Sequence, residues 1–183
     1  RQFAQRKGKV LPDVYAVVDI ETTGLNPQND EIIEIGAILV KEHRIEAEFS
    51  QLVRSSKQVS PEIEKLTGIT NEMIQNEGKE LCLTMKQLFE FLGIVPVVSH
   101  NSNFDYGFLR NACEKCDLPL FSNRCIDTLS LARRRVKKIK NYKLGTLAEY
   151  FSIAIPESHR SIVDCEKTYR IFEELIKLDA TSE

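Results

Sequence analysis

The hydrophobic positions in the first third of the chain form three short runs that predict β-strands. These runs, at residues 14–21, 31–41 and 44–53, are separated by the polar segments NPQND and KEH. Apolar runs that are rich in β-branched residues and bounded by turn residues are typical of strands. We therefore expect an antiparallel meander in which the strand at 14–21 is central.

Helical patterns alternate with two further strands in the rest of the chain. Ser60 followed by Pro61 is typical of a helix start. The segment IVPVVSHN after Gly93 predicts a short strand covered on both faces, and CIDTLSLARR contains a fifth strand. The remaining helices are expected at residues 71–76, 83–92, 104–115, 143–151 and 161–178. This order predicts an α/β fold with a mixed five-stranded sheet, three antiparallel strands and then two parallel ones, with helices on both faces.

The composition is typical of one globular domain. Of the 183 residues, 42% are hydrophobic and 28% are charged. No apolar run approaches the ~20 residues of a transmembrane helix, and the basic segment RQFAQRKGK is followed by VLP instead of the apolar core of a signal peptide. We expect a single domain over residues 1–183 with flexible ends at 1–12 and 179–183, a cytoplasmic location and no membrane partner.

The five cysteines do not predict a disulfide framework, because they are odd in number and scattered. Cys113 and Cys116 form a C-x-x-C pair, which leaves a zinc or redox role as the less favoured alternative. No second Cys or His pair lies at zinc-finger spacing, and the surrounding sequence FLRNACEKC is typical of the end of an amphipathic helix.

Two acidic residues interrupt the apolar pattern of the first strand. In VVDIETTGLN, Asp19 and Glu21 share one strand face with Val17 because side chains alternate. Two neighbouring carboxylates beside an apolar run are costly, since each resists desolvation and repels the other. No Lys or Arg lies between residues 9 and 41. Compensation must come from a distant basic residue or a bound metal ion, unless this strand end is simply wetted by solvent.

Three more polar residues stand where predicted elements end. Asp105 could stabilise the first turn of a helix, Asp164 fits an S-x-x-D capping pattern with Ser161, and His159 alone would be an ordinary surface histidine. Together, however, the four acids and the histidine fall at ends of elements that a central first strand brings to one sheet edge. Carboxylate oxygens suit Mg²⁺ or Mn²⁺.

Two such ions about 4 Å apart form the arrangement that clamps the attacking and leaving oxygens of a phosphoryl displacement. A histidine, whose unperturbed pKa is near 6.5, is suited to take a proton from the attacking water. The acids and the histidine therefore predict metal-assisted phosphoryl chemistry.

The segments that carry these residues resemble the motifs of a nuclease family. DIETTGLN, HNSNFDYGFL and HRSIVDCEKT are similar to the three exonuclease motifs of the DEDD superfamily, histidine-bearing (DEDDh) subtype, which includes the epsilon proofreading subunit of bacterial DNA polymerase III. Segments 66–74, 126–134 and 143–153 also resemble family segments in family order. The resemblance implies a ribonuclease H-like fold and hydrolysis from the 3′ end of single-stranded DNA, releasing nucleoside 5′-monophosphates in proofreading or repair.

The resemblance also implies roles for the residues at the predicted site. Asp19 would bridge two divalent ions, Glu21 and Asp164 would complete one ion site, and Asp105 would hold the second ion, partly through water. His159 would be the general base, on a stretch that closes over substrate. The implied substrate contacts are Thr22, Thr23, Gly24 and Leu25, with Leu25 against the terminal base, and His100, Asn101 and Phe104.

A basic run contrasts with the net charge of −2. RRRVKKIK at 133–140 is either a solvated helix end or a contact to the nucleic-acid backbone that weakens with salt. Its basic residues are Arg133, Arg134, Arg135, Lys137, Lys138 and Lys140.

Two alternatives stay open at the level of function. Trimming of RNA 3′ ends is the alternative within the enzyme class, because discrimination rests on the 2′-hydroxyl. A catalytically silent nucleic-acid-binding or polymerase-docking module is the alternative of another class. The expected partners are a nucleic-acid 3′ end and a DNA polymerase or helicase, in trans or fused.

Overall fold

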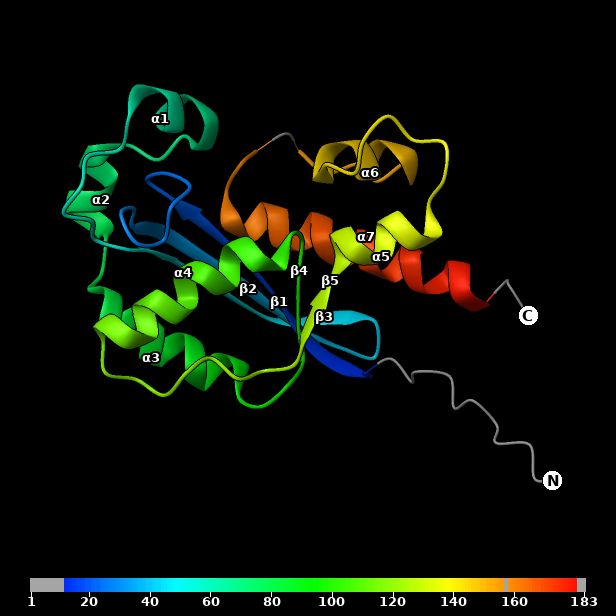
Figure 1. Cartoon of the computed structure of the whole chain (residues 1–183), viewed down its shortest axis with the longest axis horizontal. Helices are drawn as coiled ribbons and strands as arrows, with labels where there is room; N and C mark the ends of the chain where they lie inside the picture. The colour runs from blue at the N-terminus through cyan, green and yellow to red at the C-terminus, as the bar shows by residue number, and fades with distance from the viewer. Residues whose placement is uncertain (1–11, 157, 181–183) are drawn as a thin grey trace.

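The protein is built on a mixed β-sheet (Figure 1). The computed structural model describes residues 12–156 and 158–180, so the ends expected to be flexible lie largely outside the described residues. The strands are β1 (Val14–Thr22), β2 (Ile32–Lys41), β3 (Arg44–Leu52), β4 (Val97–Ser99) and β5 (Cys125–Asp127). Their order is β3-β2-β1-β4-β5, with antiparallel pairs among the first three and parallel pairs from β1 to β4 and β5. The predicted sheet and the central place of β1 are confirmed.

The two faces of β1 build two different cores. Ala16 and Val18 pack on one face, and Tyr15 and Val17 pack on the other. This alternation follows from the two-residue period of a strand. Because both faces of β1 are covered, its sequence is an almost continuous apolar run.

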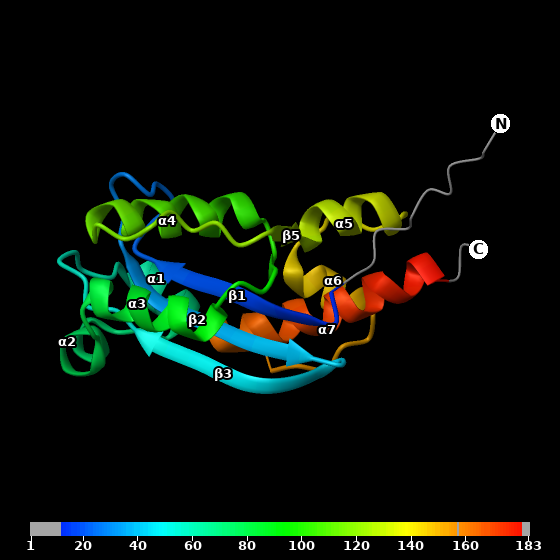
Figure 2. The same cartoon turned by 90° about the horizontal axis from the view of Figure 1, so that it is seen from below.

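Helices cover both faces of the sheet (Figures 1 and 2). The first face carries α3 (Leu81–Leu92) and α4 (Ser102–Lys115). The opposite face carries α5 (Thr128–Arg135), α6 (Leu144–Tyr150) and α7 (Ser161–Ala180). The short helices α1 (Pro61–Thr67) and α2 (Asn71–Glu77) connect β3 to α3. In the described part of the chain, no helix has the length and hydropathy that crossing a membrane requires.

The turn between β4 and α4 differs from the sequence expectation. The fourth strand covers only Val97–Ser99, and α4 begins at residue 102 instead of 104. Asn101 adopts a left-handed conformation with φ of 65°, and Asp127 accepts its backbone N–H at 2.9 Å. Asp127 also caps α5 through the backbone N–H groups of Leu129 and Ser130. One side chain at the end of β5 thus fixes the starts of two helices, a contact that a local pattern does not reveal.

A disulfide bond joins Cys82 and Cys116, contrary to the expectation from cysteine spacing. Cys82 lies in the first turn of α3 and Cys116 caps the end of α4. The start of α3 lies beside the end of α4, so the Cα atoms of the two cysteines are 5.3 Å apart, within the range that disulfides require. The pairing depends on helix packing across 34 residues. Cys113, the other member of the C-x-x-C pair, is a buried free thiol.

Reducing the Cys82–Cys116 bond should lower the free energy of unfolding by roughly 2–4 kcal/mol, because the bond restricts the unfolded chain. Urea denaturation of the wild type with and without a thiol reductant measures this change. Cys125→Ser, which removes an exposed free thiol, is the control and should keep the wild-type response to reductant. Identical denaturation midpoints for the oxidised and reduced wild type would contradict the prediction.

Candidate active site

The carboxyl end of β1 carries the first two acids of the predicted site. Asp19 and Glu21 continue the face of β1 that Tyr15 and Val17 occupy, and both are partly buried. The pairing of β1 with β4 ends at Val17. The last residues of β1 therefore extend past the neighbouring strand, and that side of β1 is left to other groups.

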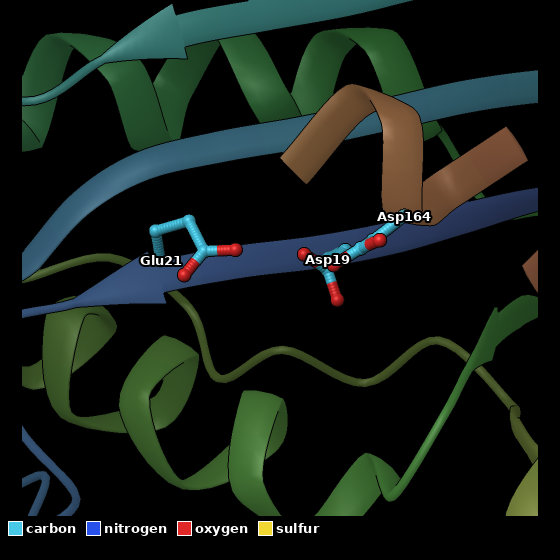
Figure 3. A group of neighbouring side chains, drawn as sticks. All are labelled: Asp19, Glu21 and Asp164. Atoms are coloured by element: carbon cyan, nitrogen blue, oxygen red, sulfur yellow. The ribbon is translucent and has the colours of Figure 1, made fainter. Parts of the chain in front are cut away.

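The third acid comes from α7, which lies directly against β2 at Gly36. A Cβ atom on Gly36 would lie 2.6 Å from the backbone carbonyl carbon of Ser161, so a larger residue would push the start of α7 away. Gly36 pairs with Asp19 across the β1–β2 ladder. This close approach brings Asp164, in the first turn of α7, beside β1. One carboxylate oxygen from each of Asp19, Glu21 and Asp164 lies within 4.8 Å of the others (Figure 3).

Asp105 approaches the same strand from the first turn of α4. Its side chain is buried, with the residue only 3% exposed, and the nearby backbone N–H groups of Asp105 itself and of Ile20 lower its pKa, which partly offsets the effect of burial. Ile20 belongs to the part of β1 that extends beyond β4. Asp105 is not one of the three clustered residues, but its charge acts strongly on Asp19.

Burial raises the pKa values of all four acids, and repulsion between the acids raises those of Asp19 and Glu21 further. The pKa of Asp19 lies well above its ordinary value, first because of burial and then because of the charges of Asp105, Glu21 and Asp164. Burial, followed by the charge of Asp164, raises the pKa of Glu21 to about 8. Burial raises the pKa of Asp105 to about 8. At neutral pH and without a cation, Glu21 and Asp105 therefore favour their protonated forms.

His159 stands at the rim of the acidic cluster. Its side chain is 58% exposed, and its Nδ1 lies 3.9 Å from Oδ2 of Asp164. The structure thus brings the histidine and the four acids together, although they come from segments spread over most of the sequence. An exposed imidazole beside buried carboxylates is accessible to a substrate and to water.

The loop after β1 presents the first group of predicted substrate contacts. The Thr22 hydroxyl donates to the Gly24 carbonyl at 2.6 Å, and the Thr23 N–H donates to the Glu31 carbonyl at 2.8 Å. Leu25 is 85% exposed at the tip of this loop. The loop is closed by its own hydrogen bonds and offers an apolar side chain to solvent.

The second group of predicted contacts follows β4. His100 has its Nδ1 2.8 Å from the Thr128 hydroxyl and its Nε2 2.9 Å from the Tyr142 carbonyl. Both ring nitrogens are therefore engaged inside the protein, so His100 holds its turn in place. Asn101 is exposed and Phe104 is partly buried.

The basic run lies at the end of α5 and in the loop after it. Arg135 is partly buried and donates to the Leu175 carbonyl at 2.7 Å. Lys140 lies 3.7 Å from the Glu149 carboxylate. The other basic residues of the run are exposed: Arg133, Arg134, Lys137 and Lys138.

Two charged residues near the site are not marked by any pattern in the sequence. Glu34 is fully buried on β2, and Lys167 is 9% exposed on α7. The carboxylate of Glu34 accepts hydrogen bonds from the guanidinium of Arg160. The ammonium of Lys167 donates a hydrogen bond to the Asp164 carboxylate at 3.2 Å. Glu34 stands in the predicted apolar run and Lys167 in a mixed helix, so no local pattern marks them as partners of the site.

The donor set fits a hard divalent cation. Asp19, Glu21 and Asp164 offer converging carboxylate oxygens, the ligands that Mg²⁺ and Mn²⁺ prefer. Cys165 is completely buried, and its thiol contacts the Val17 carbonyl. Positive charge between the acids would remove the repulsion that raises their pKa values.

Comparison with known proteins places the chain in a nuclease family. The RNase T family model, described as an exonuclease, matches residues 16–172. The chain is similar to the PolC-type DNA polymerase III of Caldanaerobacter subterraneus subsp. tengcongensis, with 38% identity over 167 residues. The PolC-type polymerase of Listeria innocua is 36% identical over 163 residues. These matches cover 91% and 89% of this chain but only 12% and 11% of the two polymerases.

Solved structures share the fold. Exonuclease X in complex with 5′ overhanging duplex DNA is 25% identical, with a TM-score of 0.69 over 91% of this chain and 93% of that chain. The nuclease domain of 3′hExo, a DEDDh family member bound to rAMP, is 24% identical, with a TM-score of 0.77 over 90% and 92% of the two chains. Exonuclease I of E. coli with a dT13 oligonucleotide is 16% identical, with a TM-score of 0.81 over 93% and 42%.

The metal-free protein should lose stability as the pH rises from about 5 to 8. Glu21 and Asp105 have folded-state pKa values near 8, above the ordinary values of 4.5 and 3.8. In this range the folded state holds protons that the unfolded state has released, so the free energy of unfolding falls with pH, by up to about 1.4 kcal/mol per pH unit for each proton.

Denaturation in a chelator at several pH values measures this fall, and saturating Mn²⁺ should abolish it by replacing the protons. Glu21→Gln, which has no proton to lose at this position, should show a shallower dependence on pH. A metal-free stability that increases from pH 5 to 8 would contradict the raised pKa values.

Proposed function

The chain belongs to the RNase T exonuclease family, and we propose that it removes nucleotides from the 3′ end of single-stranded DNA with the help of two divalent ions. The DEDDh resemblance found in the sequence is confirmed by the family match and the structural neighbours. The observation that carries the proposal is the convergence of Asp19, Glu21 and Asp164 with Asp105 and His159 beside them.

Each acid has a role that follows from its position. Asp19 would contact both ions, because it lies closest to the charges of Asp105, Glu21 and Asp164, which add to burial in raising its pKa. Glu21 and Asp164 would complete one ion site. Asp105 would hold the second ion from the side of α4. When bound, Mg²⁺ or Mn²⁺ would neutralise charge on the scissile phosphate and favour ionisation of the attacking water.

The remaining steps use the chain's own groups. His159 would accept the proton of the attacking water, since its exposed imidazole stands beside Asp164. The loop after β1 would receive the terminal nucleotide, with Leu25 against its base. The water oxygen would bond to the phosphorus of the terminal nucleotide, and the bond from that phosphorus to the 3′-oxygen of the preceding nucleotide would break. The 3′-oxygen would take up a proton and become the new 3′ end, and the terminal nucleotide would leave as a nucleoside 5′-monophosphate.

DNA is the preferred substrate in this proposal because the curated relatives are DNA polymerases. Their matching region is a small part of a long chain, which supports proofreading or repair beside a polymerase, in trans or fused. RNA trimming is the second candidate, and the neighbour bound to rAMP favours it. A silent binding module would have no use for four acids that repel one another.

Asp19→Ala should lower the rate of Mn²⁺-dependent degradation by several orders of magnitude, because the shared ion ligand is lost. The substrates are two 3′-tailed single strands of identical sequence, one DNA and one RNA. Without metal, the variant should be as stable as the wild type or more stable, because repulsion is relieved. Gel electrophoresis of the products measures the rate.

Glu48→Ala, which removes an exposed acid from the same sheet, is the matched control and should keep wild-type activity. Shortening from the 3′ end that is faster on DNA would support the proposal. Faster shortening of RNA would favour RNA trimming instead. Near-full activity of Asp19→Ala would show that the site is wrongly assigned. Absence of degradation by the wild type would favour the silent module.

Neutralising Arg133 and Arg134 together should weaken DNA binding without lowering kcat at saturating DNA. Both are exposed at the end of α5, and each phosphate contact to single-stranded DNA contributes about 0.7 to the slope of log affinity against log salt concentration. The slope should therefore become shallower by up to about 1.4. Lys86→Ala, on α3 across the sheet, is the control, and an unchanged slope in the double variant would favour a solvated helix end.

A further inference from the structure

The residues on both sides of His159 are tied to buried charged groups. Ser158 precedes it and Arg160 follows it, and each contacts a different element of the fold. His159 itself is more than half exposed. The position of its imidazole therefore depends on how firmly the backbone on either side is held.

Glu34 holds the following side. Its fully buried carboxylate accepts a hydrogen bond from Nε of Arg160 at 2.8 Å and another from Nη2 of the same guanidinium. The second carboxylate oxygen accepts the backbone N–H of Ser161 at 2.8 Å. Glu34 thus locks the start of α7 to β2. A buried carboxylate with three donors is well compensated.

Lys167 holds the preceding side. Its ammonium donates to the Ser158 carbonyl at 3.2 Å and to Oδ1 of Asp164 at 3.2 Å. Its side chain is 11% exposed, and burying a lysine is unfavourable unless its charge is paired and hydrogen-bonded. One ammonium therefore joins an acid of the cluster to the backbone next to the histidine.

A second lysine of α7 provides a comparison within the same helix. Lys177 pairs with Glu174 three residues earlier, as Lys167 pairs with Asp164. The Lys177 side chain, however, is 66% exposed. The feature that distinguishes Lys167 is burial together with its bond to the Ser158 carbonyl.

We propose that Lys167 and Glu34 are positioning residues for His159. Lys167 fixes the Ser158 carbonyl, and Glu34 fixes the Arg160 side chain and the Ser161 backbone N–H, so that the imidazole stays beside Asp164 before substrate arrives. The inference rests on the proposed function, because it takes His159 as the group that accepts the proton. Preorganisation of such a group reduces the ordering that must occur during the reaction.

The test compares Lys167→Met with Lys177→Met. Methionine keeps an unbranched apolar stem and removes the ammonium. At saturating Mn²⁺ and pH 7.5, kcat of Lys167→Met should fall by about tenfold, a part of the 10²–10⁴-fold that a general base contributes, with KM for DNA within about twofold. Lys177→Met should keep both constants. If Lys167→Met does not fold, Lys167→Gln, which retains a shorter donor, replaces it.

A double-mutant cycle with His159→Ala shows whether Lys167 acts through the histidine. If it does, Lys167→Met should lower kcat in the wild-type background and have no further effect when His159 is absent. NMR relaxation of the metal-free protein supplies a readout without activity: the backbone order parameters of Ser158, His159 and Arg160 should be lower in Lys167→Met but not in Lys177→Met.

The outcomes separate this inference from the proposed function. An active wild type with the same tenfold loss in both backgrounds would overturn the positioning role and show that Lys167 acts on Asp164 directly. Unchanged kcat with altered half-saturation for Mn²⁺ would overturn it in the same way. A wild type without metal-dependent nuclease activity would overturn the proposed function and this inference with it.

Discussion

The repulsion between carboxyl groups at the carboxyl end of β1 is the constraint on which the surrounding structure depends. Burial and neighbouring negative charge raise the pKa of Asp19 and of Glu21. When no cation is present, bringing these ionised carboxylates together therefore costs free energy. Packing elsewhere must supply the opposing free energy. Two apolar cores, one on each face of β1, and the close contact of α7 with Gly36 hold the acids together.

Glu21 and Glu34 show how the fold treats two neighbouring acids differently. They face each other across the β1–β2 ladder. Glu34 is fully buried and receives the Arg160 guanidinium and the Ser161 N–H. Glu21 has no comparable partner among the hydrogen bonds of the described residues, and its pKa rises to about 8. Glu34 therefore connects β2 to the start of α7. Glu21 has oxygens that remain available to a cation.

The sequence predicted the parts of this structure that depend on local pattern. Strand alternation placed Asp19 and Glu21 on one face of a central strand, and the motif segments located Asp105, His159 and Asp164. The sequence did not predict three other features: the Cys82–Cys116 bond, the capping of two helices by Asp127 and the contacts of Lys167. Each of them depends on the packing of elements that are distant in sequence, and the residues involved have no distinctive neighbours.

Two segments flank the acidic cluster, the loop after β1 and the residues around His159. Both are held in place by hydrogen bonds and close packing. On one side, the loop after β1 is closed by two hydrogen bonds: the Thr23 N–H donates to the Glu31 carbonyl, and the Glu31 N–H donates to the Thr23 hydroxyl. Gly24 lies so close to Asp30 that a Cβ atom would be 2.4 Å from its carboxylate. On the other side, Ser158 and Arg160 are tied to Lys167 and Glu34. Except for the bond from Lys167 to Asp164, these contacts do not use the oxygens of the clustered acids, so the flanking segments can keep their shape while the charge between the acids changes. A cation that binds between the acids would enter an arrangement that already exists, and its binding free energy would not be needed to order the surrounding chain.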